Sequence, residues 1–264
     1  MTPLSAGNAR VKEARKLSRR SVRTERRLFL ADGPKAVEGA LGKVLDPGQD
    51  CVVEVFATPA AASEYADLLG PVAVTLVDDR AMHGLSDSVS PAGLVAVCRL
   101  IDVPVAEAVA GDLVALCADV RDPGNAGTVI RTADAAGAAG VVLAGDAVDL
   151  HNPKTIRASV GSAFHLPVAL ERDSAAAVRA ARDAGLTVLA ADGAGEMDLF
   201  DADDLLGRPT AWLFGNEAWG LPAELAALAD HRVRIPIAGR AESLNLATAA
   251  AVCLFASARA QAAR

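Results

Sequence analysis

Aromatic side chains are scarce in this sequence, at 3 % of its 264 residues, although apolar residues make up 52 %. A core of ordinary size must therefore be built from Ala, Val and Leu. No run of roughly 18 or more apolar residues occurs, so no membrane-spanning helix is expected. The N-terminus also lacks the basic-then-apolar order of a signal peptide, and we expect a cytoplasmic protein.

Cysteine and histidine are few, with four of each. The cysteines Cys51, Cys98, Cys117 and Cys253 lie far apart, each within an apolar run, and no CxxC pair is present. This pattern predicts buried free thiols in a reducing compartment. The histidines are equally scattered, which argues against a zinc site, and no metal is predicted.

Positive charge is concentrated at one end of a chain whose formal net charge is −7. Residues 1–27 carry a net charge of +7, which leaves −14 on the rest of the chain. A basic segment on an acidic body predicts contact with a polyanion through that segment, and a solvated helix face is the alternative. The residues predicted to make this contact are Arg10, Lys12, Arg15, Lys16, Arg19, Arg20 and Arg23.

The first part of the chain has the pattern of a small α/β domain. Helices are expected over 8–28, 35–41 and about 60–69. Strands are expected over 28–30, 52–57, 72–77 and 94–98. Residues 99–111, which contain Pro104, are the expected connection, so the predicted domains are 1–104 and 105–264.

Residues 105–264 alternate between apolar strands and helices. Strands are expected over 113–119, 141–144, 168–170, 187–191, 211–214 and 232–237. Helices are expected at about 126–136, 153–159, 174–184, 222–229 and 244–261. Near-continuous apolar strands between helices predict a parallel sheet covered on both faces. Such sheets bind ligands at the carboxyl ends of their strands, so function is expected in the strand-to-helix loops.

The first loop of interest, residues 119–127, contains Pro-Gly-Asn-Ala-Gly at the start of a predicted helix. Such a turn exposes backbone N–H groups at a helix N-terminus. We expect Asn125 and Arg131 to face a common anionic or hydroxyl-bearing ligand. An ordinary loop with a solvated Arg131 is the alternative.

Two further loops combine polar residues with tight turns. In residues 213–222 two glycines bracket Glu217 directly after a strand, where burial and partners can fix its ionisation. Capping of the next helix is the alternative role for this carboxylate. In residues 235–246 Ser243 is a plausible N-cap of an Ala-rich helix. Capping by Ser243 would leave Asn245 unexplained, since its amide also offers donors and an acceptor at the helix start.

Together these loops resemble the SpoU/TrmH family of RNA ribose 2′-O-methyltransferases, within the SPOUT class. Three family elements, N-x-G-x(3)-R, G-x-E-x-x-G-L and I-P…S-L-N, occur here in order. The residues that match them are Asn125, Gly127 and Arg131, then Gly215, Glu217, Gly220 and Leu221, then Ile235, Pro236, Ser243, Leu244 and Asn245. Residues 152–164 also resemble the family's N-P-K…R-x-S-x-G segment. The similarity covers about residues 112–262.

The resemblance implies methyl transfer from S-adenosylmethionine to a ribose 2′-hydroxyl of RNA, with 23S ribosomal RNA favoured over transfer RNA. It also implies a homodimer and a deep C-terminal trefoil knot, which are properties of that family. The catalytic residues it implies are Arg131, Asn125, Glu217, Ser243 and Asn245. The cofactor-binding residues it implies are Gly215, Asn216, Gly220, Leu221, Ile235, Ile237 and Leu244. Lys154 and Arg157 are added to the predicted RNA contacts.

The N-terminal half is similar, more loosely, to the substrate-binding domain of larger family members. Residues 29–38 resemble its F-x-x-E-G…V-x-E stretch, with Asp32 where Glu is commoner. That domain is ribosomal-protein-like and binds RNA. This role agrees with the basic segment at residues 10–27.

The chemistry of a ribose 2′-hydroxyl leaves one step open. In the family the arginine that matches Arg131 is implicated in activating this poor nucleophile, yet a guanidinium stays protonated in proteins. Either an RNA phosphate or a neighbouring group assists the deprotonation, or Arg131 stabilises the developing alkoxide while another group takes the proton.

Other classes of function fit less well. Neither GxGxxG nor GxxxxGK is present, which disfavours a nicotinamide- or nucleotide-dependent enzyme. A non-catalytic RNA-binding relative is disfavoured by the complete set of matched residues. A base-methylating SPOUT enzyme is disfavoured by the N-x-G-x(3)-R element, which such relatives usually lack.

Overall fold

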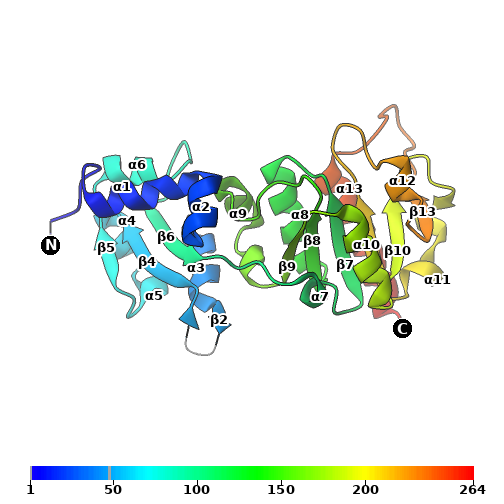
Figure 1. Cartoon of the computed structure of the whole chain (residues 1–264), viewed down its shortest axis with the longest axis horizontal. Helices are drawn as coiled ribbons and strands as arrows, with labels where there is room; N and C mark the ends of the chain where they lie inside the picture. The colour runs from blue at the N-terminus through cyan, green and yellow to red at the C-terminus, as the bar shows by residue number, and fades with distance from the viewer. Residues whose placement is uncertain (1, 47–48) are drawn as a thin grey trace. The chain divides into compact units, whose positions relative to one another are not determined.

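The structure is a computed structural model that describes residues 2–46 and 49–264. The chain divides into two compact units (Figure 1). The first comprises Met1–Ile101 and His151–His165, and the second comprises Asp102–Leu150 and Leu166–Arg264. The segment His151–His165 therefore packs with the first unit, although it lies far along the sequence.

A four-stranded mixed sheet forms the centre of the first unit. Its order is β1 (Leu28–Asp32), β6 (Leu94–Arg99), β4 (Val52–Ala57) and β5 (Val74–Leu76), with only β4 and β5 parallel. The helices are α1 (Ala9–Arg15), η1 (Lys16–Ser18), α2 (Arg20–Arg26), α3 (Pro34–Gly42), α4 (Pro59–Glu64), α5 (Ala66–Leu69), α6 (Asp79–Leu85), α9 (Pro153–Ser159) and η2 (Ser162–Phe164). The hairpin β2 (Val44–Asp46) and β3 (Gln49–Asp50) completes it. The expected small α/β domain is present, although the sequence did not reveal α6 or the hairpin.

The single basic helix expected over 8–28 is wrong. Arg19 has extended backbone (φ −91°, ψ 129°) and separates η1 from α2. Arg23 is buried, with 3 % of its surface exposed, and its guanidinium donates to the carbonyl oxygens of Leu17 (2.9 Å) and Ser18 (2.8 Å). These carbonyls lose their helical partners where the helix ends, so a buried arginine stabilises the break.

Seven parallel strands form the sheet of the second unit, which confirms the predicted parallel sheet. Their order is β11 (Met197–Asp198), β13 (His231–Arg234), β10 (Thr187–Ala191), β12 (Thr210–Phe214), β7 (Leu113–Ala118), β8 (Gly140–Ala144) and β9 (Val168–Glu171). The strand expected over 232–237 ends at Arg234. Pro236 follows two residues later and has no N–H to donate to a neighbouring strand.

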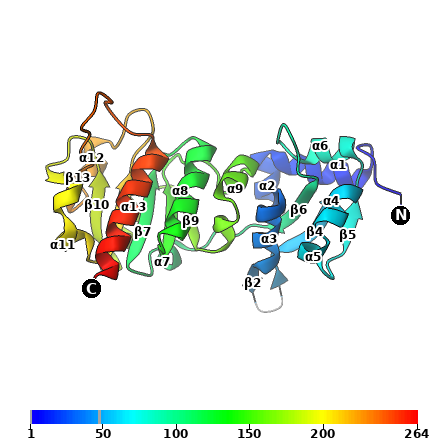
Figure 2. The same cartoon turned by 180° about the vertical axis from the view of Figure 1, so that it is seen from behind.

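Helices cover both faces of this sheet, as expected. The helices are α7 (Val105–Ala108), α8 (Pro123–Ala135), α10 (Ser174–Asp183), η3 (Leu199–Asp201), α11 (Asp203–Leu206), α12 (Ala223–Ala226) and α13 (Leu246–Ala262). Figure 2 shows α13 beside α8 over β7, and α10 lies on the face seen in Figure 1. Val114, Leu116 and Val142 pack with Val178 of α10 in one apolar cluster. No helix in residues 2–46 and 49–264 is long and apolar enough to cross a membrane.

All four cysteines are free and buried, as the sequence predicts. Burial, with a smaller effect of the Glu217 charge, raises the pKa of Cys117 to about 12. Cys117 lies on central strand β7 and is therefore a protonated, apolar core residue at neutral pH. Cys253 on α13 has a raised pKa for the same reason, its burial.

One buried polar contact ties α13 to the sheet and can be tested. Trp212 Nε1 donates to Ser257 Oγ at 2.9 Å, and both residues are fully buried. Ser257→Ala leaves the indole N–H without a partner, so the free energy of unfolding should fall by about 1–3 kcal/mol. Thr248→Ala, at an exposed position of the same helix, is the control and should stay within about 0.5 kcal/mol. Equal stability of the two variants in denaturant titrations would contradict this role.

Candidate functional site

The strands β7, β10, β12 and β13 run in parallel, so the loops after them meet at one edge of the sheet. The loop after β7 begins with Asp119, whose φ of 54° lies in the left-handed region. The carboxylate of Asp119 accepts from the backbone N–H of Asp146 at 2.7 Å. This contact holds the first loop at the start of its turn into α8.

A tight turn follows β12. Asn216 and Gly220 exchange two backbone hydrogen bonds, each of 2.9 Å, and Gly220 has a φ of 71°. A Cβ on Gly215 would lie 2.3 Å from the carbonyl carbon of Gly220, so only glycine fits there. The buried Asn216 amide donates to the Asp119 carbonyl oxygen at 2.7 Å. The turn is therefore rigid and fixed to the first loop.

Glu217 sits within this turn and accepts hydrogen bonds from the first loop. Its Oε1 accepts from the side chain of Asn125 (3.1 Å) and the backbone N–H of Asp122 (3.1 Å). Its Oε2 accepts from the backbone N–H of Arg121 at 3.3 Å. Partial burial raises the pKa of Glu217, but these hydrogen bonds outweigh it and hold the pKa below its usual value. The carboxylate is therefore ionised at neutral pH.

Asn245 adds the third loop to the same network. Its Nδ2 donates to Asn125 Oδ1 at 3.1 Å, and its Oδ1 accepts from the backbone N–H groups of Ala247 (2.9 Å) and Thr248 (3.3 Å). Asn245 is thus the N-cap of α13, so the expectation that Ser243 caps this helix is wrong. Glu217, Asn125 and Asn245 form one hydrogen-bonded chain across three loops that are distant in sequence.

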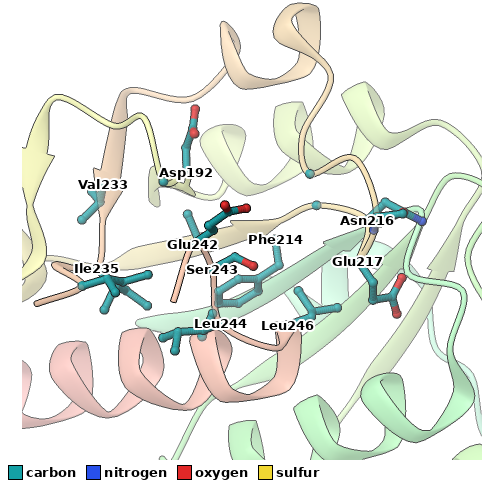
Figure 3. A pocket seen from close by; sticks show the side chains of 17 residues that line it. Asp192, Phe214, Asn216, Glu217, Val233, Ile235, Glu242, Ser243, Leu244 and Leu246 are labelled. Atoms are coloured by element: carbon teal, nitrogen blue, oxygen red, sulfur yellow. Dashed lines mark hydrogen bonds between the residues drawn. The ribbon is translucent and has the colours of Figure 1, made fainter. Parts of the chain in front are cut away.

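A cavity of about 290 Å³ lies beside these hydrogen-bonded side chains (Figure 3). Phe214, Val233, Ile235, Leu244 and Leu246 give it apolar walls. Asp192, Glu217, Glu242 and Ser243 add polar groups, as Figure 3 shows. An apolar pocket with a few convergent polar groups, at the carboxyl edge of a parallel sheet, is the usual form of a small-molecule site.

Six of the seven residues expected to bind cofactor line this cavity, namely Gly215, Asn216, Gly220, Ile235, Ile237 and Leu244. Leu221 does not, because its side chain packs against the apolar cluster between the sheet and α10. Ser243 lines the cavity but caps nothing. The expected role of Leu221 therefore gives way to a packing role.

The predictions from the sequence do not place the end of β10 or Glu242 at the cavity wall. Ala191, Asp192 and Gly193, at and after the end of β10, line the cavity. The signal was available, because an Asp-Gly pair directly follows an expected central strand. Parallel strands bind ligands at this end, so the rule that singled out the other loops also applied here.

Arg131 stands apart from the hydrogen-bonded chain. Its side chain is exposed and forms no hydrogen bond or ion pair with any residue that the structure describes. It follows Asn125 by six positions on α8, which places the two about 120° apart around the helix axis. The structure therefore brings together Asn125, Glu217 and Asn245 but leaves the Arg131 guanidinium open to solvent.

The basic residues of the N-terminal segment fall into two groups. Arg10 pairs with Glu54 and donates to Thr75 Oγ1 at 3.0 Å, and Lys16 pairs with Glu13 at 2.6 Å. Arg23 is buried, so its predicted RNA contact is wrong. Among the residues predicted to contact RNA, the exposed side chains that form no ion pair within the described part of the chain are Lys12, Arg15, Arg19 and Arg20.

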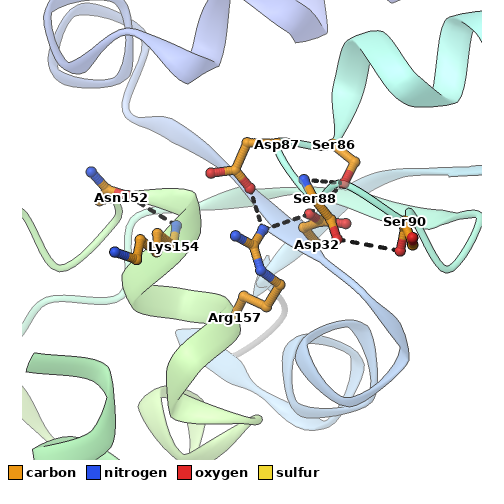
Figure 4. A network of polar contacts seen from close by, with 8 residues as sticks. All are labelled: Asp32, Ser86, Asp87, Ser88, Ser90, Asn152, Lys154 and Arg157. Atoms are coloured by element: carbon orange, nitrogen blue, oxygen red, sulfur yellow. Dashed lines mark hydrogen bonds and ion pairs between the residues drawn. The ribbon is translucent and has the colours of Figure 1, made fainter. Parts of the chain in front are cut away.

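Arg157 belongs to a polar network of the first unit (Figure 4). Its Nη1 donates to Asp32 Oδ2 at 2.9 Å and to the carboxylate of Asp87, and Ser86 Oγ donates to Asp32 at 2.6 Å. Burial raises the pKa of Asp32, against the lowering effect of Ser86 and Arg157. Arg157 is thus engaged with two carboxylates of its own unit, and its RNA contact stays a prediction. Lys154 is exposed at the start of α9.

Residues 112–255 match the SpoU rRNA Methylase family. The chain belongs to this family. Residues 8–96 match the MRM3-like substrate binding domain. The two matches cover the parallel-sheet unit with its cavity and the small mixed-sheet unit, as the resemblance implied.

Relatives of similar length share both parts. The 23S rRNA (guanosine(2553)-2′-O)-methyltransferase RlmP of Bacillus subtilis is 33 % identical over 95 % of this chain and 96 % of its own. The AdoMet-bound rRNA methyltransferase from Sinorhizobium meliloti superimposes with a TM-score of 0.81 at 33 % identity, covering 98 % and 97 % of the two chains. The SpoU methyltransferase AviRb from Streptomyces viridochromogenes gives a TM-score of 0.82 at 31 % identity, covering 97 % and 98 %.

The ionisation of Glu217 provides a test of the network. Asn125→Ala removes a hydrogen bond that lowers the pKa of Glu217, so this pKa should rise toward its ordinary value. In the wild type the ionised Glu217 should accordingly persist as pH falls until the depressed pKa is reached, and in the variant Glu217 should become protonated at a higher pH. Carbon-13 NMR titration of labelled Glu would measure the shift. Thr128→Ala on the same helix is the control, because its hydroxyl donates to Gly124 rather than Glu217; an equal pKa in all three proteins would refute the assignment.

Proposed function

We propose that this chain transfers a methyl group from S-adenosylmethionine to a ribose 2′-hydroxyl of RNA, with 23S ribosomal RNA as its substrate. The hydrogen-bonded chain Glu217–Asn125–Asn245 carries this proposal, because it joins the three family elements beside one cavity. The B. subtilis relative, similar over nearly the whole chain, is named as a 2′-O-methyltransferase of 23S rRNA.

The apolar walls and the polar groups of the cavity both suit S-adenosylmethionine. Phe214, Ile235 and Leu244 offer apolar surface to an adenine ring, and the carboxylates of Asp192 and Glu242 suit hydroxyl and ammonium groups. A volume of about 290 Å³ lies at the lower end of ligand pockets, which span about 300–1,000 Å³. When bound, this cofactor supplies an electrophilic methyl group on a sulfonium. The residues proposed to hold it are Asp192, Gly215, Asn216, Gly220, Ile235, Ile237 and Leu244.

The protein's contribution to the reaction is alignment and electrostatics. Asn125, Glu217 and Asn245 hold the three loops in one geometry, and such preorganisation accounts for much of the rate of a two-reactant transfer. Arg131 offers an unpaired guanidinium that can bind the 2′-oxygen as negative charge develops on it. The proton released from the 2′-hydroxyl is proposed to pass to a phosphate oxygen of the bound RNA beside Arg131. Ser243, at the cavity wall, is proposed to contact the substrate ribose.

The larger assembly is proposed as follows. Residues 1–104 serve as the RNA-binding domain and residues 105–264 as the methyltransferase domain, with a deep trefoil knot at its C-terminal end. The protein acts as a homodimer without a metal ion in the cytoplasm. The exposed Phe255 on α13 supports a contact between copies, and the buried free thiols suit a reducing compartment.

The decisive experiment combines the purified protein with tritiated S-adenosylmethionine and unmodified 23S rRNA. We expect labelled RNA whose modified linkage resists alkaline hydrolysis, because methylation blocks the 2′-oxygen. DNA of the same sequence should stay unlabelled, since it lacks the 2′-hydroxyl. An alkali-labile product would indicate base methylation, preferential labelling of transfer RNA would replace the proposed substrate, and RNA binding without label would indicate a non-catalytic relative.

Arg131→Ala should abolish methylation and leave cofactor affinity within about twofold of the wild type, because Arg131 lies outside the cavity lining. Tritium transfer and isothermal titration calorimetry with S-adenosylmethionine would measure the two quantities. Arg172→Ala, which removes an exposed arginine elsewhere on the same unit, should retain activity. Full activity of the Arg131 variant would eliminate this residue from the mechanism.

The basic segment is proposed to grip the RNA backbone. Replacing Lys12, Arg15, Arg19 and Arg20 by Gln should weaken RNA binding and reduce the salt dependence of log K by about 0.7–0.9 for each phosphate that is no longer neutralised. Cofactor affinity should not change. Replacing Arg172 and Arg179 by Gln removes exposed positive charge elsewhere on the chain and should leave RNA binding and its salt dependence unchanged. Salt titrations of RNA binding that coincide for wild type and the four-site variant would show that the segment binds no phosphate.

A further inference from the structure

Trp219 is a large aromatic residue left open to solvent in a chain with few aromatics. Only 2 of the 264 residues are tryptophan. Trp212 is fully buried, whereas 56 % of the surface of Trp219 is exposed. An exposed indole offers a large planar apolar surface, and the turn that carries Trp219 lines the ligand cavity, so this ring is placed to meet a ligand of that site.

The ring of Trp219 is held in place. The turn that carries it is closed by the two hydrogen bonds between Asn216 and Gly220, each of 2.9 Å. The guanidinium carbon of Arg121 lies 5.2 Å from the ring centroid, within the range of a cation–π contact. Asp146 pairs with Arg121 at 2.7 Å and holds the guanidinium from its other end. The Arg121 guanidinium thus lies over the Trp219 ring, and we name this pair the Trp219 platform.

The platform is attached to the proposed catalytic network rather than to the cavity. The backbone N–H of Arg121 donates to Glu217 Oε2, and Trp219 follows Glu217 by two residues. Ala218 and Gly220 line the cavity on either side of Trp219 in sequence, but Trp219 itself does not. Its ring is therefore free to meet a second ligand while the cavity is filled.

We propose that the Trp219 platform stacks an unpaired base of the RNA substrate, beside the ribose that is methylated. This inference rests on the proposed function. Bases splayed out of single-stranded loops stack on aromatic rings and on arginine planes, whereas bases inside a duplex are covered by their neighbours. The platform therefore selects a nucleotide in a loop or bulge of RNA. Stacking tolerates every base, so it selects an accessible nucleotide rather than one sequence.

The two tryptophans allow a direct test with the intact protein. The probe is a transcribed 23S rRNA fragment that the wild-type protein methylates. Its binding should quench the emission of exposed Trp219 and leave that of buried Trp212 unchanged. Trp219→Phe should accordingly show almost no quenching, and the fragment annealed to its complement should not quench the wild type. Methylation of the fragment without any quenching in the wild type would overturn the platform alone. Failure of the wild-type protein to methylate any 23S rRNA fragment would overturn the proposed function and the platform with it.

Affinity measurements separate stacking from charge and from folding. Trp219→Ala should weaken RNA binding about five- to hundredfold, the range found when a stacking residue is removed, and Trp219→Phe should restore most of it. The salt dependence of log K, the affinity for S-adenosylmethionine and the melting temperature should stay at their wild-type values. Phe200→Ala removes another exposed aromatic of the same unit and should leave RNA binding unchanged. Unchanged RNA affinity in Trp219→Ala, or conversion of a dimer to a monomer in sedimentation, would overturn the proposal.

Discussion

The site depends on the ionised carboxylate of Glu217. A carboxylate only accepts hydrogen bonds, so it fixes the orientation of the Asn125 amide, whose remaining oxygen accepts from Asn245. The oxygen of Asn245 is then left to cap α13, which requires an acceptor. Because each hydrogen bond needs one donor and one acceptor, neither the Asn125 amide nor the Asn245 amide can be turned around without breaking this series of hydrogen bonds. One charge thereby sets the start of α8, the turn after β12 and the start of α13.

The sequence led to this arrangement because its three loops follow strands of one parallel sheet. Parallel strands end at a common edge, so loops that are distant in sequence meet there. The sequence does not predict where individual side chains point. Ser243 and Asn245 are both good caps by residue type, and the cap is decided by which oxygen reaches Ala247 and Thr248. Asp192 was overlooked because its loop carries no motif, although it follows a strand of the same edge.

Charged residues show the limit of reasoning from composition. Arg23 and Arg157 each raise the count of positive charge, yet both are bound to partners inside the first unit. Arg23 donates to two carbonyl oxygens that lack helical hydrogen-bond partners because the helix breaks at Arg19. Arg157 meets Asp32, which is 125 positions away in the sequence. A charge count cannot distinguish such residues from exposed ones, because the partners are brought together by the tertiary fold alone.

The turn after β12 also links the two reactants of the proposed reaction. Glu217, Ala218 and Gly220 face the cavity, while Trp219 of the same turn lies outside it. A methyl donor in the cavity and a base on Trp219 would thus be positioned by five consecutive residues, Asn216 to Gly220, closed by two hydrogen bonds. Transfer rates fall steeply when reacting atoms move by about 1 Å, so a short rigid turn is better suited to this task than two separate loops. The lack of room for a Cβ at Gly215 and the positive φ of Gly220 are then requirements of the alignment, because either substitution would open the turn.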